Sequence, residues 1–168
     1  MDPVNPKLLR KGETMEENGF GTLFIVSTPV GNLGDISYRA IETLKEVDII
    51  AAEDTRHTLK LLNHYSIKKP LISYFEHNKR QRGEELADRL KKGFNIALVT
   101  DAGTPGISDP GEDIIKLAVA NNIRVTMIPG PTSSIIGLVL SGLSCERFCF
   151  EGFLPHGSGE RKKQLEFL

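Results

Sequence analysis

The sequence predicts an α/β domain built on an open, mainly parallel β-sheet flanked by helices. Short apolar segments, typical of buried parallel strands, alternate along the chain with segments whose apolar residues recur at helical spacing. The connections between them are short and rich in Gly, Pro, Asp and Thr, as expected for βαβ units. With 168 residues, the chain is long enough for one domain of ordinary size.

Six segments are predicted as strands: residues 22–27, 47–53, 70–75, 95–100, 124–129 and 148–154. Helical segments are predicted at residues 36–44, 59–62, 77–92, 110–118 and 135–143, with a last helix starting near residue 160. Asp35 is the expected N-cap of the first helix, and Asp109 the expected cap of the helix that Pro110 opens. Thr132 or Ser133 is expected to cap the apolar helix that follows the fifth strand.

Composition and charge exclude several classes of protein. Apolar residues make up 39% of the chain, enough to build a core, but no apolar run approaches the roughly 20 residues that cross a bilayer. Residues 1–21 contain no apolar signal-peptide core and are interpreted as a flexible leader, so we expect a cytoplasmic protein. Cys145 and Cys149 have no second pair, which fits neither a disulfide framework nor a zinc site. Because the net charge is −1, any nucleic-acid binding must use a local patch.

Four loops follow predicted strands, at residues 29–35, 53–57, 101–106 and 129–133. Because ligands of open α/β sheets bind at the carboxyl ends of the strands, we expect these loops to outline one pocket. None of the loops contains lysine, a G-x-G-x-x-G motif or a phosphate-binding loop, which disfavours dinucleotides and triphosphates. Their small residues favour a ligand held largely through backbone groups.

The charged residues near these loops have two interpretations each. Asp54 and Arg56 form either an ion pair that stabilises the turn or a proton acceptor with an anion clamp. Asp101 either caps a structural turn or faces a ligand. The charged stretch 77–92 is interpreted as a solvated helix face in preference to an RNA contact, because acidic residues are interleaved with the basic ones.

Five ordered segments, STPVGNLGDIS, AAEDTRHT, LVTDAGTPGISDPG, IPGPTS and RFCFEGFLP, closely resemble the ribosomal RNA small subunit methyltransferase I family. This family belongs to the tetrapyrrole methylase superfamily, and the resemblance extends from about residue 22 to the end of the chain. It implies transfer of a methyl group from S-adenosylmethionine to the ribose 2′-oxygen of a cytidine in small-subunit (16S) rRNA. The implied partners are that rRNA or the small ribosomal subunit, and a second copy of the chain in a homodimer.

The same resemblance assigns site residues. The donor would be bound by Pro29, Asp101, Ala102, Gly103, Thr104, Ile107, Thr132 and Ser133. The resemblance assigns no catalytic base; from the chemistry of their loop, Asp54 is proposed as the proton acceptor, and Arg56 is proposed to position RNA or a loop. No metal is expected, since the methyl of a sulfonium already has an activated leaving group.

The chain departs from the superfamily pattern in two places. Its first loop is PVGNLGD, where the superfamily has a G-x-G-x-G-D opening. Family members also have a complete second α/β domain, which is largely missing here, so we interpret residues 22–144 as the N-terminal methylase domain and 145–168 as the start of a truncated second domain. Because half of the donor cleft would then be absent, we expect the isolated chain to bind the donor weakly or not at all.

Two other functions remain open from the sequence. One is a methylase of a tetrapyrrole or another small substrate, which the AAEDTRHT segment disfavours by resemblance only. The other is a non-catalytic domain that assembles through the apolar side chains of residues 148–168.

Overall fold

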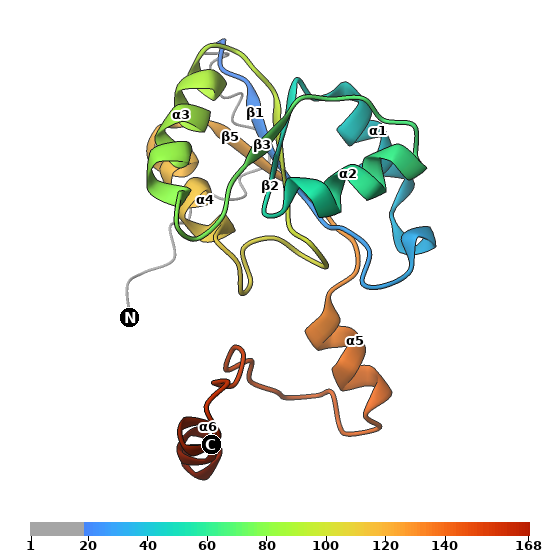
Figure 1. Ribbon diagram of the computed structural model, residues 1–168, viewed down its shortest axis with the longest axis vertical. Helices are drawn as coiled ribbons and strands as arrows, with labels where there is room; N and C mark the ends of the chain where they lie inside the picture. The colour runs from blue at the N-terminus through green and yellow to red at the C-terminus, as the bar shows by residue number, and fades with distance from the viewer. Residues whose placement is uncertain (1–18) are drawn as a thin grey trace.

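The computed structural model describes residues 19–168, and its centre is one five-stranded sheet. The strands are β1 (Thr22–Val26), β2 (Ile49–Ala52), β3 (Leu71–Ser73), β4 (Ile96–Val99) and β5 (Arg124–Ile128). Their order across the sheet is β3-β2-β4-β1-β5, and every neighbouring pair is parallel (Figure 1). The predicted open parallel sheet is therefore confirmed. Residues 1–18 of the predicted leader lie outside the described residues.

Two pairs of helices cover the two faces of the sheet. Helices α1 (Tyr38–Glu46) and α2 (Thr55–His64) lie on one face, and α3 (Lys79–Lys91) and α4 (Gly111–Ala120) lie on the other (Figure 1). Each face has its own apolar cluster. In β4, Ile96 and Leu98 pack into the cluster that α3 and α4 cover, whereas Ala97 and Val99 pack into the other. This alternation is the two-residue period of a strand, and it explains why β2 and β4 are apolar throughout.

The structure corrects one predicted cap and supports another. Asp35 does not cap the first helix, because it lies in a short 3₁₀ turn, and α1 starts later. The Ser37 hydroxyl caps α1 instead, by accepting the backbone N–H of Ala40 at 3.2 Å. Asp109 does serve the start of α4, where its Oδ1 accepts the N–H of Gly111 at 3.2 Å, although Pro110 occupies the N-cap position itself.

The chain beyond the sheet differs from the prediction. Residues 148–154 form neither strand nor helix, and the side chain of Phe153 is 77% exposed. A strand persists only beside a partner strand, and the described part of the chain provides none next to this segment. Helices α5 (Ser133–Leu140) and α6 (Ser158–Phe167) bury no residue and lie away from the sheet (Figure 1). The domain boundary after residue 144 stays a prediction.

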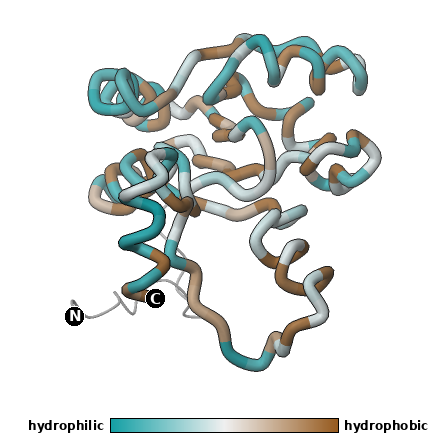
Figure 2. The backbone as a smooth tube through the Cα atoms, turned by 60° about the horizontal axis from the view of Figure 1, so that its bottom comes forward, coloured by the Kyte–Doolittle hydropathy of each residue, from teal (hydrophilic) through white to brown (hydrophobic). Residues whose placement is uncertain are grey.

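Helix α5, with the sequence SSIIGLVL, consists largely of apolar residues, so much of its tube is brown in Figure 2. Val139 and Leu140 are 61% and 81% exposed, so this helix presents apolar surface to solvent. No helix among residues 19–168 is both long and apolar enough to cross a membrane.

Candidate functional site

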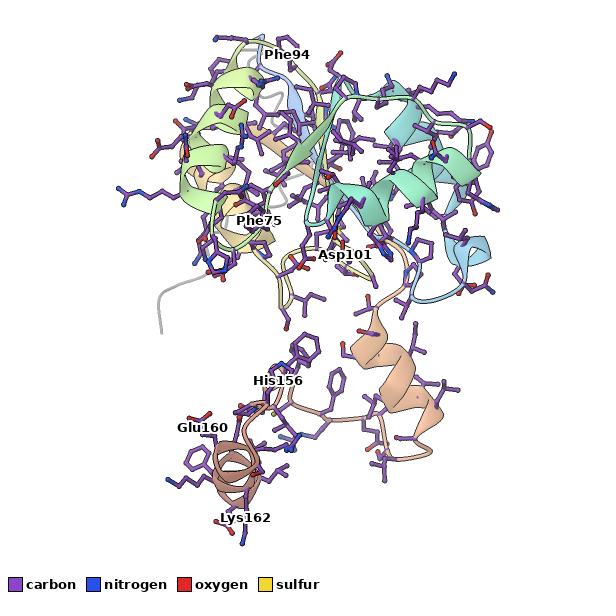
Figure 3. The ribbon with its side chains drawn as sticks, in the orientation of Figure 1. Phe75, Phe94, Asp101, His156, Glu160 and Lys162 are labelled. Atoms are coloured by element: carbon purple, nitrogen blue, oxygen red, sulfur yellow. The ribbon has the colours of Figure 1, made fainter. Side chains whose placement is uncertain are left out.

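A cavity of about 450 Å³ lies where the carboxyl ends of the strands meet the C-terminal segment. Its volume is within the range of about 300–1,000 Å³ typical of small-molecule sites. It is lined by Glu53, Thr100, Asp101, Ala102, Thr104, Ile107, Ser108, Asp109, Thr132, Ser133, Ser134, Phe150 and Phe153. Asp101 lies at this edge of the sheet and faces the segment that carries His156 (Figure 3).

Most of the residues assigned to the donor by resemblance come together here. Asp101, Ala102, Thr104, Ile107, Thr132 and Ser133 all line the cavity. Pro29 and Gly103 are not among the lining residues, and the first loop, 29–35, contributes none. Three of the four predicted loops therefore form the pocket, and the first does not.

Gly103 holds the cavity loop against the end of β1. Its backbone pairs with that of Thr28 in an antiparallel bridge, with N···O distances of 2.9 and 3.1 Å. The φ angle of Gly103 is +88°, a left-handed conformation that favours glycine. Gly103 thus fixes the pocket loop from outside the lining, through its bridge to Thr28.

A cluster of hydroxyl groups ties the pocket loops together. The Thr104 hydroxyl lies 3.1 Å from that of Ser27 and 2.7 Å from that of Thr132, and it donates to the carbonyl of Pro131 at 3.2 Å. Thr132 occupies the N-cap position of α5, but its side chain makes no capping bond. The predicted cap is therefore wrong for this hydroxyl, which faces Thr104 instead.

Two carboxylates stand side by side in the pocket wall. Glu53 Oε2 accepts the hydroxyl of Thr100 at 2.7 Å and the N–H of Asp101 at 3.4 Å. Asp101 Oδ1 accepts the N–H of Asp54 at 3.2 Å. Burial raises the pKa of Asp101, and the negative charge of Glu53 raises it further, whereas the N–H of Asp54 opposes the shift. The pair suits a cationic ligand, and Asp101 can take up a proton nearer to neutral pH than an ordinary carboxylate.

Asp54 and Arg56 form the ion pair that the sequence left as one alternative. Asp54 caps α2 by accepting the N–H of Arg56 at 2.8 Å, and its carboxylate also accepts Nε and Nη2 of the same arginine at 3.2 and 2.8 Å. These bonds hold the pKa of Asp54 well below its usual range. Neither residue is among those lining the cavity. Their assigned catalytic roles stay predictions.

Several lining residues escaped the sequence prediction. Glu53 lies in a loop predicted to outline the pocket but has no role assigned from the sequence, although it directly follows β2. Phe150 and Phe153 come from a segment that the apolar pattern predicted as a strand. Their aromatic character was the available signal, but nothing in the local sequence indicates that this segment turns back beneath the pocket.

A second cavity, of about 420 Å³, adjoins the first and shares Glu53, Ser108 and Asp109 with it. Its one cation is Lys79, which forms ion pairs of 2.8 Å with both Glu76 and Asp113. Because this lysine is already neutralised, the cavity is an acidic extension of the first site.

We expect Asp101→Asn to stabilise the fold at neutral pH. The pKa of Asp101 is higher in the folded state than its unfolded value of about 3.9, so the charged form destabilises the fold above that pH. Asparagine removes the charge and keeps an acceptor for the N–H of Asp54. We expect a gain of the order of 0.5 kcal/mol at pH 7, small because solvent screens this partly exposed group.

Urea unfolding at pH 7 and at pH 3 measures this effect. The difference between variant and parent should shrink as the pH falls through the raised pKa, because the parent carboxyl then also becomes neutral. A variant less stable than the parent at pH 7 would contradict the conclusion that the partly buried charge of Asp101 destabilises the fold.

Comparison with known proteins shows the family of this chain. A sequence model of the family described as Tetrapyrrole (Corrin/Porphyrin) Methylases matches residues 22–168. The chain belongs to this family. It is 54% identical over 148 residues to ribosomal RNA small subunit methyltransferase I of Synechocystis sp., an alignment covering 88% of this chain and 53% of that protein. The proteins of the same name from Haemophilus influenzae and Bacillus subtilis are 52% and 49% identical, over 87% and 90% of this chain and 52% of each relative.

The resemblance carried by the five sequence segments is thus confirmed, and the chain spans about half the length of these relatives. Solved structures of tetrapyrrole methylase fold support the architecture. Diphthine synthase superposes with a TM-score of 0.62 at 20% identity, covering 77% of this chain and 52% of that one. Uroporphyrin-III-C-methyltransferase from Thermus thermophilus has a TM-score of 0.58 at 18% identity, covering 76% and 54%. At these identities the likeness concerns the fold alone.

Proposed function

We propose that this chain carries the donor-binding part of an S-adenosylmethionine-dependent methyltransferase that modifies the ribose 2′-oxygen of a cytidine in small-subunit rRNA. One observation carries the proposal: six of the eight residues to which the family resemblance assigns the donor line one strand-end pocket. The names of the relatives, at about half identity, support rRNA as the substrate.

The pocket residues fit the chemistry of the donor. Ala102 and the backbone of the glycine-rich loop leave room for polar atoms to reach N–H and C=O groups. Ile107, Phe150 and Phe153 provide apolar surface for a purine ring. The carboxylates of Glu53 and Asp101 complement the positive charge of a sulfonium and an amino group.

The donor supplies an activated methyl group, so the protein has to align the ribose hydroxyl and assist removal of its proton. No metal is needed for such a displacement. The geometry favours Asp101 over Asp54 as the proton acceptor, because Asp101 lines the pocket and has a raised pKa. Asp54, held anionic by Arg56, is better suited to fixing the first turn of α2.

A labelling experiment separates this function from methylation of a tetrapyrrole. The protein is incubated with methyl-labelled donor and either unmodified small ribosomal subunits or uroporphyrinogen III, and the labelled product is digested and identified. The proposal predicts label on the ribose of a cytidine and none on the tetrapyrrole. Label on the tetrapyrrole, or on a base in place of a ribose, would overturn it.

The proposed role places the protein in the cytoplasm, where ribosomal subunits are assembled, and a homodimer is the further part of the proposal. The exposed apolar side chains of Val139 and Leu140 on α5, and of Leu143 just after it, support an assembly surface at the end of this helix. Sedimentation equilibrium checks this: a twofold mass is expected, and a monomer at all concentrations would rule out the homodimer.

A further inference from the structure

Helix α2 and the segment after it form the most one-sided stretch of charge in the described structure. Residues 55–75 contain Arg56, Lys60, Lys68 and Lys69 and no Asp or Glu, in a chain whose net charge is −1. Such segregation provides the local positive patch that a polyanion would need, because the molecule as a whole does not attract one.

The Arg, Lys and His residues of α2 at every fourth position share one exposed ridge. Arg56, Lys60 and His64 are spaced four residues apart and are all exposed, while Leu61 and Leu62 on the other side pack into the core. Residues four apart lie one above the other on a helix, about 6 Å apart along its axis. The ridge therefore presents a row of basic groups along the helix.

Arg56 is paired with Asp54, but the three lysines of this stretch are not neutralised by neighbours. Within residues 19–168, Lys60, Lys68 and Lys69 take part in no ion pair. Because no Asp or Glu lies between residues 55 and 75, the charges of these lysines are available to an external anionic partner.

Helix α3 provides the contrast. Glu85 accepts hydrogen bonds from both Arg82 and Arg89, at 2.5 and 2.8 Å, so these two arginines are paired within the helix. Lys79 is likewise paired with Glu76 and Asp113. The stretch 77–92 interleaves Glu84, Glu85 and Asp88 with its basic residues, whereas residues 55–75 contain no acidic residue.

The basic ridge begins at the pocket. Glu53, which precedes α2 by two residues, lines the cavity, and the N–H of Asp54 donates to the carboxylate of Asp101. A strand bound along α2 would therefore bring one of its nucleotides to the mouth of the pocket.

We propose that Lys60, Lys68 and Lys69, together with the exposed ridge of α2, bind the phosphates of the rRNA substrate and direct the target ribose toward the pocket. This proposal rests on the proposed function, since it takes RNA as the substrate. Phosphate contacts of this kind position a nucleic acid and carry no sequence information, so the ridge sets the register of binding and leaves choice of nucleotide to other residues.

Two matched triple variants test the proposal on this chain. Lys60→Gln/Lys68→Gln/Lys69→Gln removes three charges from the α2 side, and Arg80→Gln/Lys91→Gln/Lys92→Gln removes three exposed charges from α3 and its end. Binding of a fluorescent single-stranded RNA that contains cytidines is measured by anisotropy over a range of salt concentrations. Circular dichroism confirms that each variant folds, and calorimetry with S-adenosylmethionine reports on the pocket separately.

The α2 variant should lose about tenfold in RNA affinity, and its plot of log affinity against log salt should be shallower by about 2, from roughly 0.7 per lost phosphate contact. The α3 variant should stay within about twofold of the parent, and donor binding should be unchanged in both. Equal losses of RNA affinity in the two variants, or no loss in the α2 variant, would overturn the proposal that the α2 ridge binds RNA. The proposed function would be unaffected.

Two other results bear on the partner. A parent chain that binds donor but no RNA at any salt concentration would contradict the proposed function as well as the ridge. An acidic peptide that competes for α2 as strongly as the RNA would overturn the assignment of this surface to RNA.

Discussion

Replacing Ala102 with phenylalanine is expected to reduce donor binding by at least about a hundredfold, or about 2.8 kcal/mol. Ala102 is exposed and lines the cavity, so a larger side chain at this position occupies space that a ligand would need without disturbing the core. The loop around it is fixed by the hydroxyl of Thr104 and by the backbone pairing of Gly103 with Thr28, and it has little freedom to move aside.

Ala120→Phe is the matched control for this substitution. Ala120 is an exposed alanine at the end of α4 and is not among the residues lining the cavity. Donor titrations followed by nuclear magnetic resonance should give the same affinity for this control and the parent. If Ala102→Phe bound the donor as well as Ala120→Phe does, the donor would not occupy this cavity.

Replacing Gly21 with alanine is expected to destabilise the fold by about 3 kcal/mol or more. A Cβ atom on Gly21 would overlap the carbonyl group of Phe94 and would lie 3.0 Å from the carbonyl carbon of Gly93. Its N–H donates to the carbonyl of Leu90 at 2.7 Å, so the start of β1 is held at the end of α3. This overlap can be removed only by moving the backbone at Gly21 or at residues 93–94, because the overlapping atoms belong to the backbone and not to a flexible side chain.

Gly137→Ala provides the comparison within the same protein. Gly137 lies inside α5, and an added Cβ would meet no atom within 4 Å. Alanine in a helix interior should stabilise by about 0.5–1 kcal/mol relative to glycine. Urea unfolding followed by circular dichroism measures the free energy of unfolding of both variants. A decrease below about 1 kcal/mol for Gly21→Ala would show that Gly21 does not pack this closely against Phe94.

The sheet could be predicted because its central strands have a residue pattern that is typical of buried parallel strands. Ile96 and Val99 lie in an apolar segment buried on both faces, and such short segments between turn residues are typical of parallel strands. The segment 148–154 has the same apolar and aromatic character but no strand to pair with among the described residues. Local sequence reports the tendency to form a strand, whereas the presence of a partner depends on the rest of the fold.

The pocket could be predicted in part for a similar reason. In a parallel sheet the loops after each strand must meet at one edge, which is how Asp101 and Thr132 come to line one cavity. Phe150 could not be predicted, because its position depends on how the chain returns after α5. Nor does sequence alone decide between neighbouring carboxylates: Asp54 is paired with Arg56, while Glu53 and Asp101 face the cavity.

The most direct test of the donor site is a titration of S-adenosylmethionine into the ¹⁵N-labelled chain, followed by amide chemical shifts. At 18.6 kDa the chain is well suited to this measurement, which detects weak as well as tight binding. We predict saturable shifts at Ala102, Gly103, Thr104 and Ser133, and unchanged amides at the amino ends of the strands. Shifts confined to other surfaces, or none at millimolar donor, would contradict a donor site at the carboxyl edge of this sheet.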